Sequence, residues 1–373
     1  MAQERKKRRI VLASILKPVD DTRMFDKMGT SLAQSGEYEV FIVGYPSSSS
    51  GSAPGIQFIS LAPFKRLSFQ RWSARWHVFR KVWSLKPSIL IFTTHELLFP
   101  ALLLKILINT SIVYDVQENY YRNILLSGSF PRLIGWPLAL LVRFQEKLLA
   151  PSIDHFFLAE KAYETEFKFH RGGWTVLENK AQYSGQPRPN DPVKIRGEIR
   201  LLFTGTLAEN TGVFQAITLA KELHHLQPSI TLTIVGYAAL VADRERIHRE
   251  IKSSGFIHLI GGDALVPHLN ILESIQNSDF GIMAYPLLPH TANSHPTKLF
   301  EYLSAQLPII LERHWPWKNA YEQYEPFAFI NFTKPDYPTL LQELRTKRFY
   351  TKAPAEVSWK SEESKLLKSL GNL

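Results

Sequence analysis

The stretch Ile199-Arg-Leu-Leu-Phe-Thr-Gly-Thr-Leu207 opens the part of the chain that decides the fold. It is a short apolar run that ends at a glycine, and a helix-length segment and a second apolar run follow it. The alternation continues through expected helices Gly212–Leu223, Asp243–Lys252, Val266–Ser274 and Thr297–Ala305, and expected strands Ile199–Phe203, Ile230–Val235, Ile257–Ile260, Gly281–Ala284 and Ile309–Leu311. Strands that alternate with helices in this way predict a parallel, doubly wound sheet.

The N-terminal half repeats the same alternation. Its expected strands are Arg9–Ser14, Tyr38–Val43, Gln57–Leu61, Ser88–Phe92 and Ser111–Tyr114, and its expected helices are Thr22–Ser35, an aromatic-rich segment and Leu97–Ile108. A Pro-, Gly- and Asn-rich stretch then interrupts both patterns at Tyr183–Val193. We therefore expect an α/β protein of two tandem Rossmann-like domains that face each other across a cleft, where ligands of open α/β sheets bind.

Four segments follow from this division. We expect an N-terminal Rossmann-like domain over residues 1–182, a linker over 183–196, a C-terminal Rossmann-like domain over 197–350, and a C-terminal segment over 351–373.

Composition excludes several classes of protein. With 373 residues, of which 45% are hydrophobic, the chain can bury two cores and is too apolar for disorder. The absence of Cys excludes disulfide scaffolds, thiol catalysis and Cys-ligated metal sites. No secretory signal is apparent, and the most apolar stretches are shorter than the roughly 20 residues of a spanning helix. We expect a cytoplasmic protein.

The positive charge is concentrated in the N-terminal half. Residues 1–180 carry a net charge of +9 and residues 181–373 only +1. Within the first half, residues 61–150 hold 12 basic and 4 acidic side chains. A local basic region indicates an anionic partner.

An aromatic stripe lies in the middle of this basic region. Phe69, Trp72, Trp76, Phe79 and Trp83 recur at helical spacing, so they share one face of a helix. The edges of that face carry Arg66, Arg71, Arg75, Arg80 and Lys81. Such a helix binds membrane surfaces. The simpler interpretation, which we favour at this point, is that the aromatic face is buried in the core.

The segment Asn293-Ser-His-Pro-Thr-Lys-Leu-Phe-Glu-Tyr302 reads as the start of a helix. We expect Ser294 or His295 to cap it ahead of Pro296. The N–H groups of Thr297, Lys298 and Leu299 would then point out of the helix and attract an anion.

Two charged side chains strengthen this prediction. Lys298 would add a positive charge for a diphosphate, and Glu301, on the same helix face, could accept two vicinal hydroxyls such as those of a ribose. Together they indicate a nucleoside diphosphate site. An ordinary capped helix with a solvated Lys–Glu pair is the structural alternative.

Two further segments end expected strands, where sites form in parallel sheets. Phe203-Thr-Gly-Thr-Leu-Ala-Glu-Asn-Thr-Gly212 runs from a strand to a helix start and could cradle phosphate, although it matches no dinucleotide or P-loop motif. His95 follows the expected strand Ser88–Phe92 and is a second candidate, with a structural histidine as the alternative. No metal-binding spacing is present among the His residues.

The chain resembles the GT-B-fold glycosyltransferases of the family-four type, which are retaining enzymes. The resemblance covers nearly the whole chain. The segments that carry it are Pro296-Thr-Lys-Leu-Phe-Glu-Tyr-Leu-Ser-Ala-Gln-Leu-Pro308, Val19-Asp-Asp-Thr-Arg-Met-Phe-Asp-Lys27, Leu201-Leu-Phe-Thr-Gly-Thr-Leu207 and Val357-Ser-Trp-Lys-Ser-Glu362. The last resembles the family's closing helix, which returns to pack on the N-terminal domain.

The resemblance implies that residues 1–182 form the acceptor-side domain and residues 197–350 the nucleotide-sugar-binding domain, with the closing helix in 351–373. It also implies catalytic roles for His95, Lys298 and Glu301. His95 would contact the transferred sugar, Lys298 the diphosphate, and Glu301 the donor ribose. The predicted donor-binding residues are Gly205, Thr206, Gly236, Asn293, Thr297 and Leu299. No metal and no other cofactor is expected.

The chain departs from the family pattern at three positions. Asn293 stands where the family usually has the first of two glutamates, and Thr206 and Thr211 stand where it usually has Arg and Lys. Two of the common cations for the diphosphate are therefore missing.

We accordingly predict transfer of a sugar, with retention, from a UDP- or GDP-linked donor to a glycan or lipid-linked acceptor in bacterial surface-polysaccharide synthesis. An anionic membrane surface would bind residues 61–150 and hold the protein at the inner face of the cell membrane. The alternatives are a catalytically degenerate GT-B partner or scaffold protein and, third, a nucleic-acid-binding protein, although no nucleic-acid motif is present.

Overall fold

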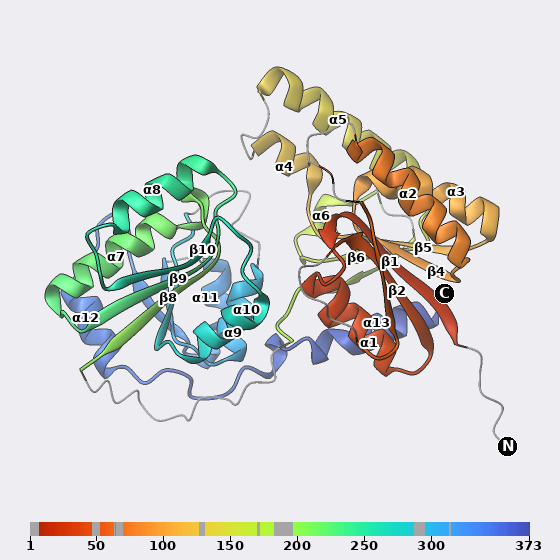
Figure 1. Cartoon of the computed structure of the whole chain (residues 1–373). Coiled ribbons are helices and arrows are strands. Elements are labelled where there is room, and N and C mark those ends of the chain that lie inside the picture. Colours follow the sequence, from red (N-terminus) through yellow and green to blue (C-terminus); the bar gives the residue numbers. More distant parts are fainter. Residues whose placement is uncertain are drawn as a thin grey trace. The chain divides into compact units, whose positions relative to one another are not determined.

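The computed structural model describes residues 7–46, 53–62, 64, 70–126, 131–169, 172–182, 197–286, 295–312 and 315–373. The chain forms two compact units (Figure 1). Unit 1 comprises Met1–Asn179 together with Trp359–Leu373, and unit 2 comprises Lys180–Ser358. The predicted domain limits were 182 and 350, and the predicted linker 183–196 lies outside the described residues.

Unit 1 contains a seven-stranded parallel sheet with the order β3-β2-β1-β4-β5-β6-β7. Its strands are β1 (Arg8–Pro18), β2 (Tyr38–Tyr45), β3 (Ile56–Ser60), β4 (Ile89–Phe92), β5 (Ser111–Val116), β6 (His155–Leu158) and β7 (Gly173–Val176). Its helices are η1 (Thr22–Gly29), α1 (Thr30–Gln34), α2 (Gln70–Leu85), η2 (His95–Leu97), α3 (Leu98–Ile108), α4 (Tyr120–Leu126), α5 (Arg132–Leu149), η3 (Ala150–Ser152), α6 (Tyr163–Glu166) and α13 (Lys360–Gly371).

Unit 2 contains a six-stranded parallel sheet with the order β10-β9-β8-β11-β12-β13. Its strands are β8 (Ile199–Thr206), β9 (Ile230–Tyr237), β10 (Ile257–Gly262), β11 (Phe280–Met283), β12 (Ile309–Glu312) and β13 (Phe327–Ile330). Its helices are η4 (Glu209–Thr211), α7 (Val213–Leu226), α8 (Val241–Ile251), α9 (His268–Gln276), α10 (Thr297–Ser304), α11 (Trp315–Tyr321), η5 (Glu322–Tyr324), α12 (Tyr337–Thr346) and η6 (Ala355–Val357). The predicted α/β class with two parallel sheets is confirmed.

Each sheet has one point at which the strand order reverses. In unit 1 it lies between β1 and β4, and in unit 2 between β8 and β11. The connections that leave two such strands cross to opposite faces of the sheet, so the strands' carboxyl ends border a crevice where ligands bind in this class of fold. The topology thus singles out the residues that follow β4 and β8.

The predicted α-helix Thr22–Ser35 begins as a π-helix. η1 covers Thr22–Gly29, and only then does the α-helix α1 begin. The side chain of Asp21 caps η1 by accepting hydrogen bonds from the N–H groups of Arg23 and Met24. Arg23 and Lys27 on this helix are buried, and π-helical turns occur mostly at functional sites.

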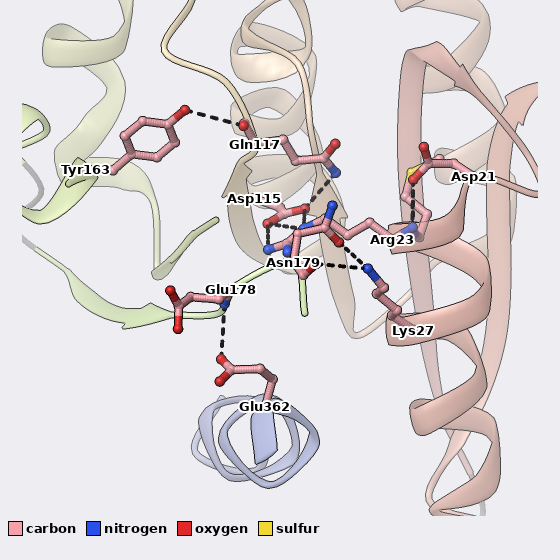
Figure 2. Close-up of polar contacts among 10 residues, drawn as sticks. Asp21, Arg23, Lys27, Asp115, Gln117, Tyr163, Glu178, Asn179 and Glu362 are labelled. Carbon is pink, nitrogen blue, oxygen red and sulfur yellow. Dashed lines mark hydrogen bonds and ion pairs between the residues drawn. The ribbon is translucent and has the colours of Figure 1, made fainter. Parts of the chain in front are cut away.

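A buried polar cluster joins η1 to β5 and to the end of unit 1 (Figure 2). Arg23 donates from Nη2 to Asp115 Oδ1 at 2.7 Å and from Nε to Oδ2 at 2.9 Å. The Nζ of Lys27 donates to Asn179 Oδ1 at 2.6 Å. Two-point pairing of this kind is what a buried guanidinium requires. The cluster therefore fixes η1 against the carboxyl end of β5.

The C-terminal helix α13 packs on unit 1, as predicted from its resemblance to a closing helix. Trp359 donates from its indole N–H to Ser31 Oγ at 2.9 Å, and Leu366 and Leu370 are fully buried in the unit 1 core. The carboxylate of Glu362 accepts a hydrogen bond from the backbone N–H of Glu178 at 3.0 Å (Figure 2). These contacts join residues more than 180 positions apart.

The prediction that the aromatic face of α2 is buried holds only in part: Trp76 and Phe79 are half-buried, and Phe79 packs against the core. The residues of α2 that enter the core are Ala74, Val78 and Val82, whereas Trp72 is 61% exposed and Trp83 is 38% exposed. The helix has two apolar faces. The narrow face, formed by Ala74, Val78 and Val82, packs against the sheet. Phe69 and Arg66 lie outside the described residues.

No helix in the described part of the chain combines the length and the apolarity needed to cross a bilayer.

The first prediction concerns the Arg23–Asp115 pair. Replacing Asp115 with Asn leaves the guanidinium charge buried without its counter-ion, so the free energy of unfolding should fall by about 3–5 kcal/mol. Urea unfolding measures this change. The matched control is Glu39→Gln, because Glu39 pairs with Arg9 on the surface at 2.9 Å. That change should cost under about 1 kcal/mol, and equal effects of the two changes would contradict the prediction.

Candidate functional site

Three glycines stand side by side at the carboxyl ends of neighbouring strands in unit 2. Gly205 of β8 pairs with Gly236 of β9, which pairs with Gly261 of β10. A Cβ atom on Gly236 would lie 1.8 Å from the carbonyl oxygen of Gly205, and one on Gly261 would lie 2.4 Å from that of Gly236. The backbones approach too closely for any side chain. The predicted binding residues Gly205 and Gly236 are therefore neighbours at this edge.

A fourth glycine brings the start of α7 against the end of β11. Gly212, the N-cap residue of α7, has a φ of 86°, and its Cβ would lie 2.1 Å from the carbonyl oxygen of Ala284. Ala284 follows β11 directly. The loop after β8 and the loop after β11 thus meet at the point where the strand order reverses.

Thr206 and Thr211 bound the loop between β8 and α7. The hydroxyl of Thr211 lies 2.7 Å from the carbonyl oxygen of Thr206 and 2.8 Å from that of Ala208, and it accepts a hydrogen bond from the Ala208 N–H at 3.1 Å. Thr206 is exposed. Thr211 therefore closes this loop, at a position where the resemblance would place a cation.

Lys298 on α10 reaches into the same edge of the sheet. Its side chain is buried, and Nζ donates to the carbonyl oxygen of Thr204 at 3.1 Å. Nζ also lies 4.0 Å from the ring centroid of Phe203 and 4.6 Å from that of Tyr285. Burial lowers the pKa of Lys298 to about 7, and the negative charge of Glu301 offsets only part of this effect. The predicted solvated Lys–Glu alternative is wrong.

Glu301 lies one turn further along α10 and is 7% exposed. Its Oε1 lies 2.8 Å from Nε2 of His268, the first residue of α9. His268 could not be predicted as a site residue from the sequence, because it stands 33 positions before Glu301 and belongs to no recognisable spacing. Its imidazole orients the carboxylate of Glu301.

Tyr302 fixes α10 against β8. Its hydroxyl accepts a hydrogen bond from the Thr204 N–H at 3.1 Å and lies 3.0 Å from the Thr204 hydroxyl. A Cβ on Gly281 would lie 2.5 Å from the ring of Tyr302, so Gly281 makes room for that ring. Tyr302 ends the segment Asn293–Tyr302, but no role was predicted for it from the sequence.

The start of α10 differs from the prediction. Pro296 is the N-cap residue and the helix has no side-chain cap, so the predicted cap by His295 is wrong. The N–H of Leu299 donates to the Pro296 carbonyl at 2.9 Å and its side chain is fully buried, so Leu299 does not offer a free N–H. Thr297 is half-buried at the first helical position. The predicted Asn293 and Ser294 lie outside the described residues.

His95 belongs to unit 1 and stands at the start of η2, next to the point where that sheet reverses. Its side chain is 13% exposed, with Nδ1 3.3 Å from Glu96 Oε2 and its ring centroid 4.7 Å from that of Tyr120. Burial lowers the pKa of His95, an effect that the negative charge of Glu96 partly opposes. Burial therefore favours the neutral form of the imidazole.

The residues around His95 have unused hydrogen-bonding capacity. Among the described residues, the hydroxyls of Thr93 and Thr94 are buried without a hydrogen-bond partner, as is Nδ1 of His95 by the same criterion. Buried polar groups are normally paired. The carboxyl end of β4 therefore holds buried polar groups that no described protein group satisfies.

Similar proteins place this arrangement in a known architecture. No protein-family model and no curated protein matches the amino-acid sequence. Among solved structures, sucrose-phosphate synthase from Thermosynechococcus elongatus is similar with a TM-score of 0.69 and 12% identity, covering 98% of this chain and 99% of that one. Anabaena HepE in complex with UDP and glucose has a TM-score of 0.63 and 12% identity, covering 98% and 100%.

A third structure, a putative UDP-N-acetylglucosamine 2-epimerase from Listeria monocytogenes, has a TM-score of 0.62 and 13% identity, covering 98% of this chain and 96% of that one. At these identities the likeness shows the fold alone. The chain has the GT-B fold, in which both transferases and an epimerase occur.

The second prediction concerns the glycine contact. Replacing Gly236 with Ala forces β8 and β9 apart, so the free energy of unfolding should fall by about 1–3 kcal/mol. Urea unfolding measures the loss. Gly255→Ala is the control, because no atom lies within 4 Å of a Cβ placed there; its effect should stay within about 0.5 kcal/mol. A tolerated Gly236→Ala would mean that the strands separate freely.

The third prediction concerns the charge of Lys298. Its pKa is about 7 when folded and near the ordinary 10.5 when unfolded. Between these values the unfolded chain binds a proton that the folded chain does not, so stability rises with pH. Relative to Lys298→Met, the wild type should gain about 2–3 kcal/mol from pH 7 to pH 9. Urea unfolding at both pH values measures it, and a constant difference would refute the buried neutral amine.

Proposed function

We propose that this protein is a glycosyltransferase that uses a UDP- or GDP-linked sugar as its donor. The observation that carries the proposal is the pair formed by Lys298 and Glu301 on α10, set beside the glycine-lined ends of β8 and β9 in a GT-B fold. The HepE structure that is similar to this chain contains UDP and glucose. Binding of a nucleotide sugar at the glycine-lined edge of unit 2 is the simplest use of these residues.

Lys298 would act on the leaving diphosphate. A diphosphate next to the amine stabilises its protonated form and so raises the pKa of Lys298 from about 7. The residue then takes up a proton as the donor binds. Positive charge held in a buried position next to the leaving group favours the breaking of the sugar–diphosphate bond.

Glu301 would bind the ribose of the donor through its carboxylate. His268 holds Oε1 of that carboxylate at 2.8 Å and sets its orientation. Gly205, Thr206, Gly236 and Thr297 line the same edge and complete the proposed donor site, and Asn293 is proposed as part of it from the sequence alone.

His95 would contact the transferred sugar from unit 1. Its neutral imidazole and the unpaired hydroxyls of Thr93 and Thr94 suit a polyhydroxylated ligand. We propose transfer with retention, as in the family-four enzymes. The acceptor oxygen bonds to the anomeric carbon on the face from which the diphosphate departs, and a diphosphate oxygen takes the acceptor proton. This step requires no nucleophile from the protein and, in our proposal, no metal or other cofactor.

The acceptor is proposed to be a glycan or a lipid-linked sugar of a bacterial surface polysaccharide. The basic region 61–150 would bring the protein to the anionic inner face of the cell membrane, so its working place would be cytoplasmic and peripheral. No nucleic acid is proposed as a partner.

The fourth prediction tests the donor site by thermal unfolding. UDP, GDP, ADP, CMP and their sugar conjugates are compared, with Lys298→Ala and Glu301→Ala beside the wild type. A ligand at about 100 times its Kd adds about 2.7 kcal/mol of stability, so one base should raise the melting temperature of the wild type and neither variant should respond. Lys334→Ala, an exposed change in the same unit, is the control and should respond like the wild type.

Product analysis distinguishes the remaining hypotheses about the function. Release of the nucleoside diphosphate together with a glycosylated acceptor supports transfer, whereas a donor sugar with inverted configuration at C2 indicates an epimerase. No shift with any nucleotide would favour a catalytically degenerate partner protein, the reading that Thr206 and Thr211 favour because both replace cations. Steeply salt-dependent nucleic-acid binding without any nucleotide effect would favour the third reading.

A further inference from the structure

Helix α5 of unit 1 exposes apolar side chains along its whole length. Leu133, in its first turn, is 91% exposed. The other large apolar residues of this helix that are at least 41% exposed are Ile134, Trp136, Leu140, Leu141, Phe144 and Leu148. They recur at helical spacing, while Ala139, Val142 and Glu146 on the other side are buried. One apolar face of α5 therefore has no packing partner among the described residues.

The apolar surface continues onto the two neighbouring helices. α5 contacts α3 and α3 contacts α2, and Figure 1 shows the three helices next to one another on one side of the unit 1 sheet. On α3, Phe99 is 50% exposed, Ile106 is 70% exposed and Leu107 is 51% exposed. The ring of Phe99 packs edge-on against Trp76 of α2 with centroids 6.3 Å apart. We call the exposed apolar residues of α2, α3 and α5 the apolar face.

Basic side chains lie on the same three helices. Among the described residues, Arg80, Lys81 and Lys147 are exposed. Arg71, Lys105 and Arg143 form ion pairs with Glu96, Asp154 and Glu146, respectively. The one acidic side chain of the three helices is Glu146, which is 1% exposed. The guanidinium of Arg75 lies 3.5 Å from the ring centroid of Trp72. A partner that binds these helices would therefore meet apolar side chains and positive charge. The three helices themselves expose no carboxylate.

This charge pattern selects the occupant of the apolar face. A second copy of the chain would bring two basic surfaces together, which like-charge repulsion opposes. An anionic bilayer complements the same surface, since apolar side chains enter the acyl boundary while Arg and Lys meet the headgroup phosphates. Eighteen residues at 1.5 Å each give α5 a length of about 27 Å, which suits a helix lying in the plane of the interface.

We infer that one part of the apolar face inserts into the headgroup region of an anionic membrane. This part consists of the exposed apolar residues of α5 and of Phe99, Ile106 and Leu107 of α3. The inference rests on the membrane partner proposed above and is independent of glycosyl transfer. It assigns insertion to α5 and α3, whereas the sequence pointed to the aromatic face of α2. The basic side chains of the three helices then contribute attraction that depends on salt.

The fifth prediction tests this insertion by co-sedimentation of the full chain with vesicles. Vesicles of phosphatidylcholine mixed with phosphatidylglycerol are compared with vesicles of phosphatidylcholine alone. The double variant Leu133→Ser, Phe144→Ser should bind the anionic vesicles at least about tenfold more weakly than the wild type, with an unchanged melting temperature because both side chains are exposed. Arg80→Gln with Lys81→Gln should weaken binding at low salt and reduce its salt dependence.

The matched control is Leu240→Ser with Leu265→Ser. These residues are 63% and 78% exposed in unit 2, so the control removes two exposed apolar side chains outside the apolar face and should bind vesicles like the wild type. The nucleotide-induced melting shift is measured on every variant. Vesicle binding without a nucleotide shift in the wild type would refute the proposed function and leave this inference standing.

Three outcomes would overturn the inference. The first is absence of wild-type binding to anionic vesicles at low salt, and the second is equal binding by the Leu133 and Phe144 double variant. The third is a wild-type dimer in sedimentation velocity that the double variant lacks, because it would show that a second copy covers the apolar face.

Discussion

The close approach of the strand ends in unit 2 is the constraint on which the candidate donor site depends. Gly205, Gly236 and Gly261 lie in register. The carbonyl oxygens of Gly205 and Gly236 occupy the space that side chains on Gly236 and Gly261 would need. The backbone of β8 just before this edge contacts α10. Thr204 uses its carbonyl for Lys298 and its N–H for the hydroxyl of Tyr302, so the helix and the strand hold each other at a fixed distance.

The buried amine gives this site its electrostatic character. A lysine among aromatic rings loses hydration, and burial therefore lowers its pKa toward neutrality. Such a residue can gain a proton when a phosphate group arrives. Since Thr206 and Thr211 leave the loop after β8 without the cations that the resemblance would supply, the proposed chemistry relies on Lys298.

Unit 1 has polar contacts that fix its buried elements and apolar side chains that are exposed on its outer helices. The buried Arg23–Asp115 pair holds the end of β5, and the hydrogen bond from Trp359 to Ser31 holds α13 against α1, whereas the outer helices expose apolar side chains to solvent. Large exposed apolar surfaces mark interaction sites in stable proteins. In the proposed function, the fixed interior positions the residues that recognise the sugar, and the exposed helices attach the protein to the membrane surface.

The sequence by itself determined the two parallel sheets and most of their elements, because apolar runs of strand length alternate with helical periodicity. It also placed Lys298 and Glu301 on one face of one helix by their spacing. Only the tertiary structure decided that Lys298 is buried, that His268 meets Glu301, and that Val78 rather than Trp72 enters the core. Periodicity defines the faces of a helix, but which face is buried, and what it touches, depends on residues that are distant in the chain.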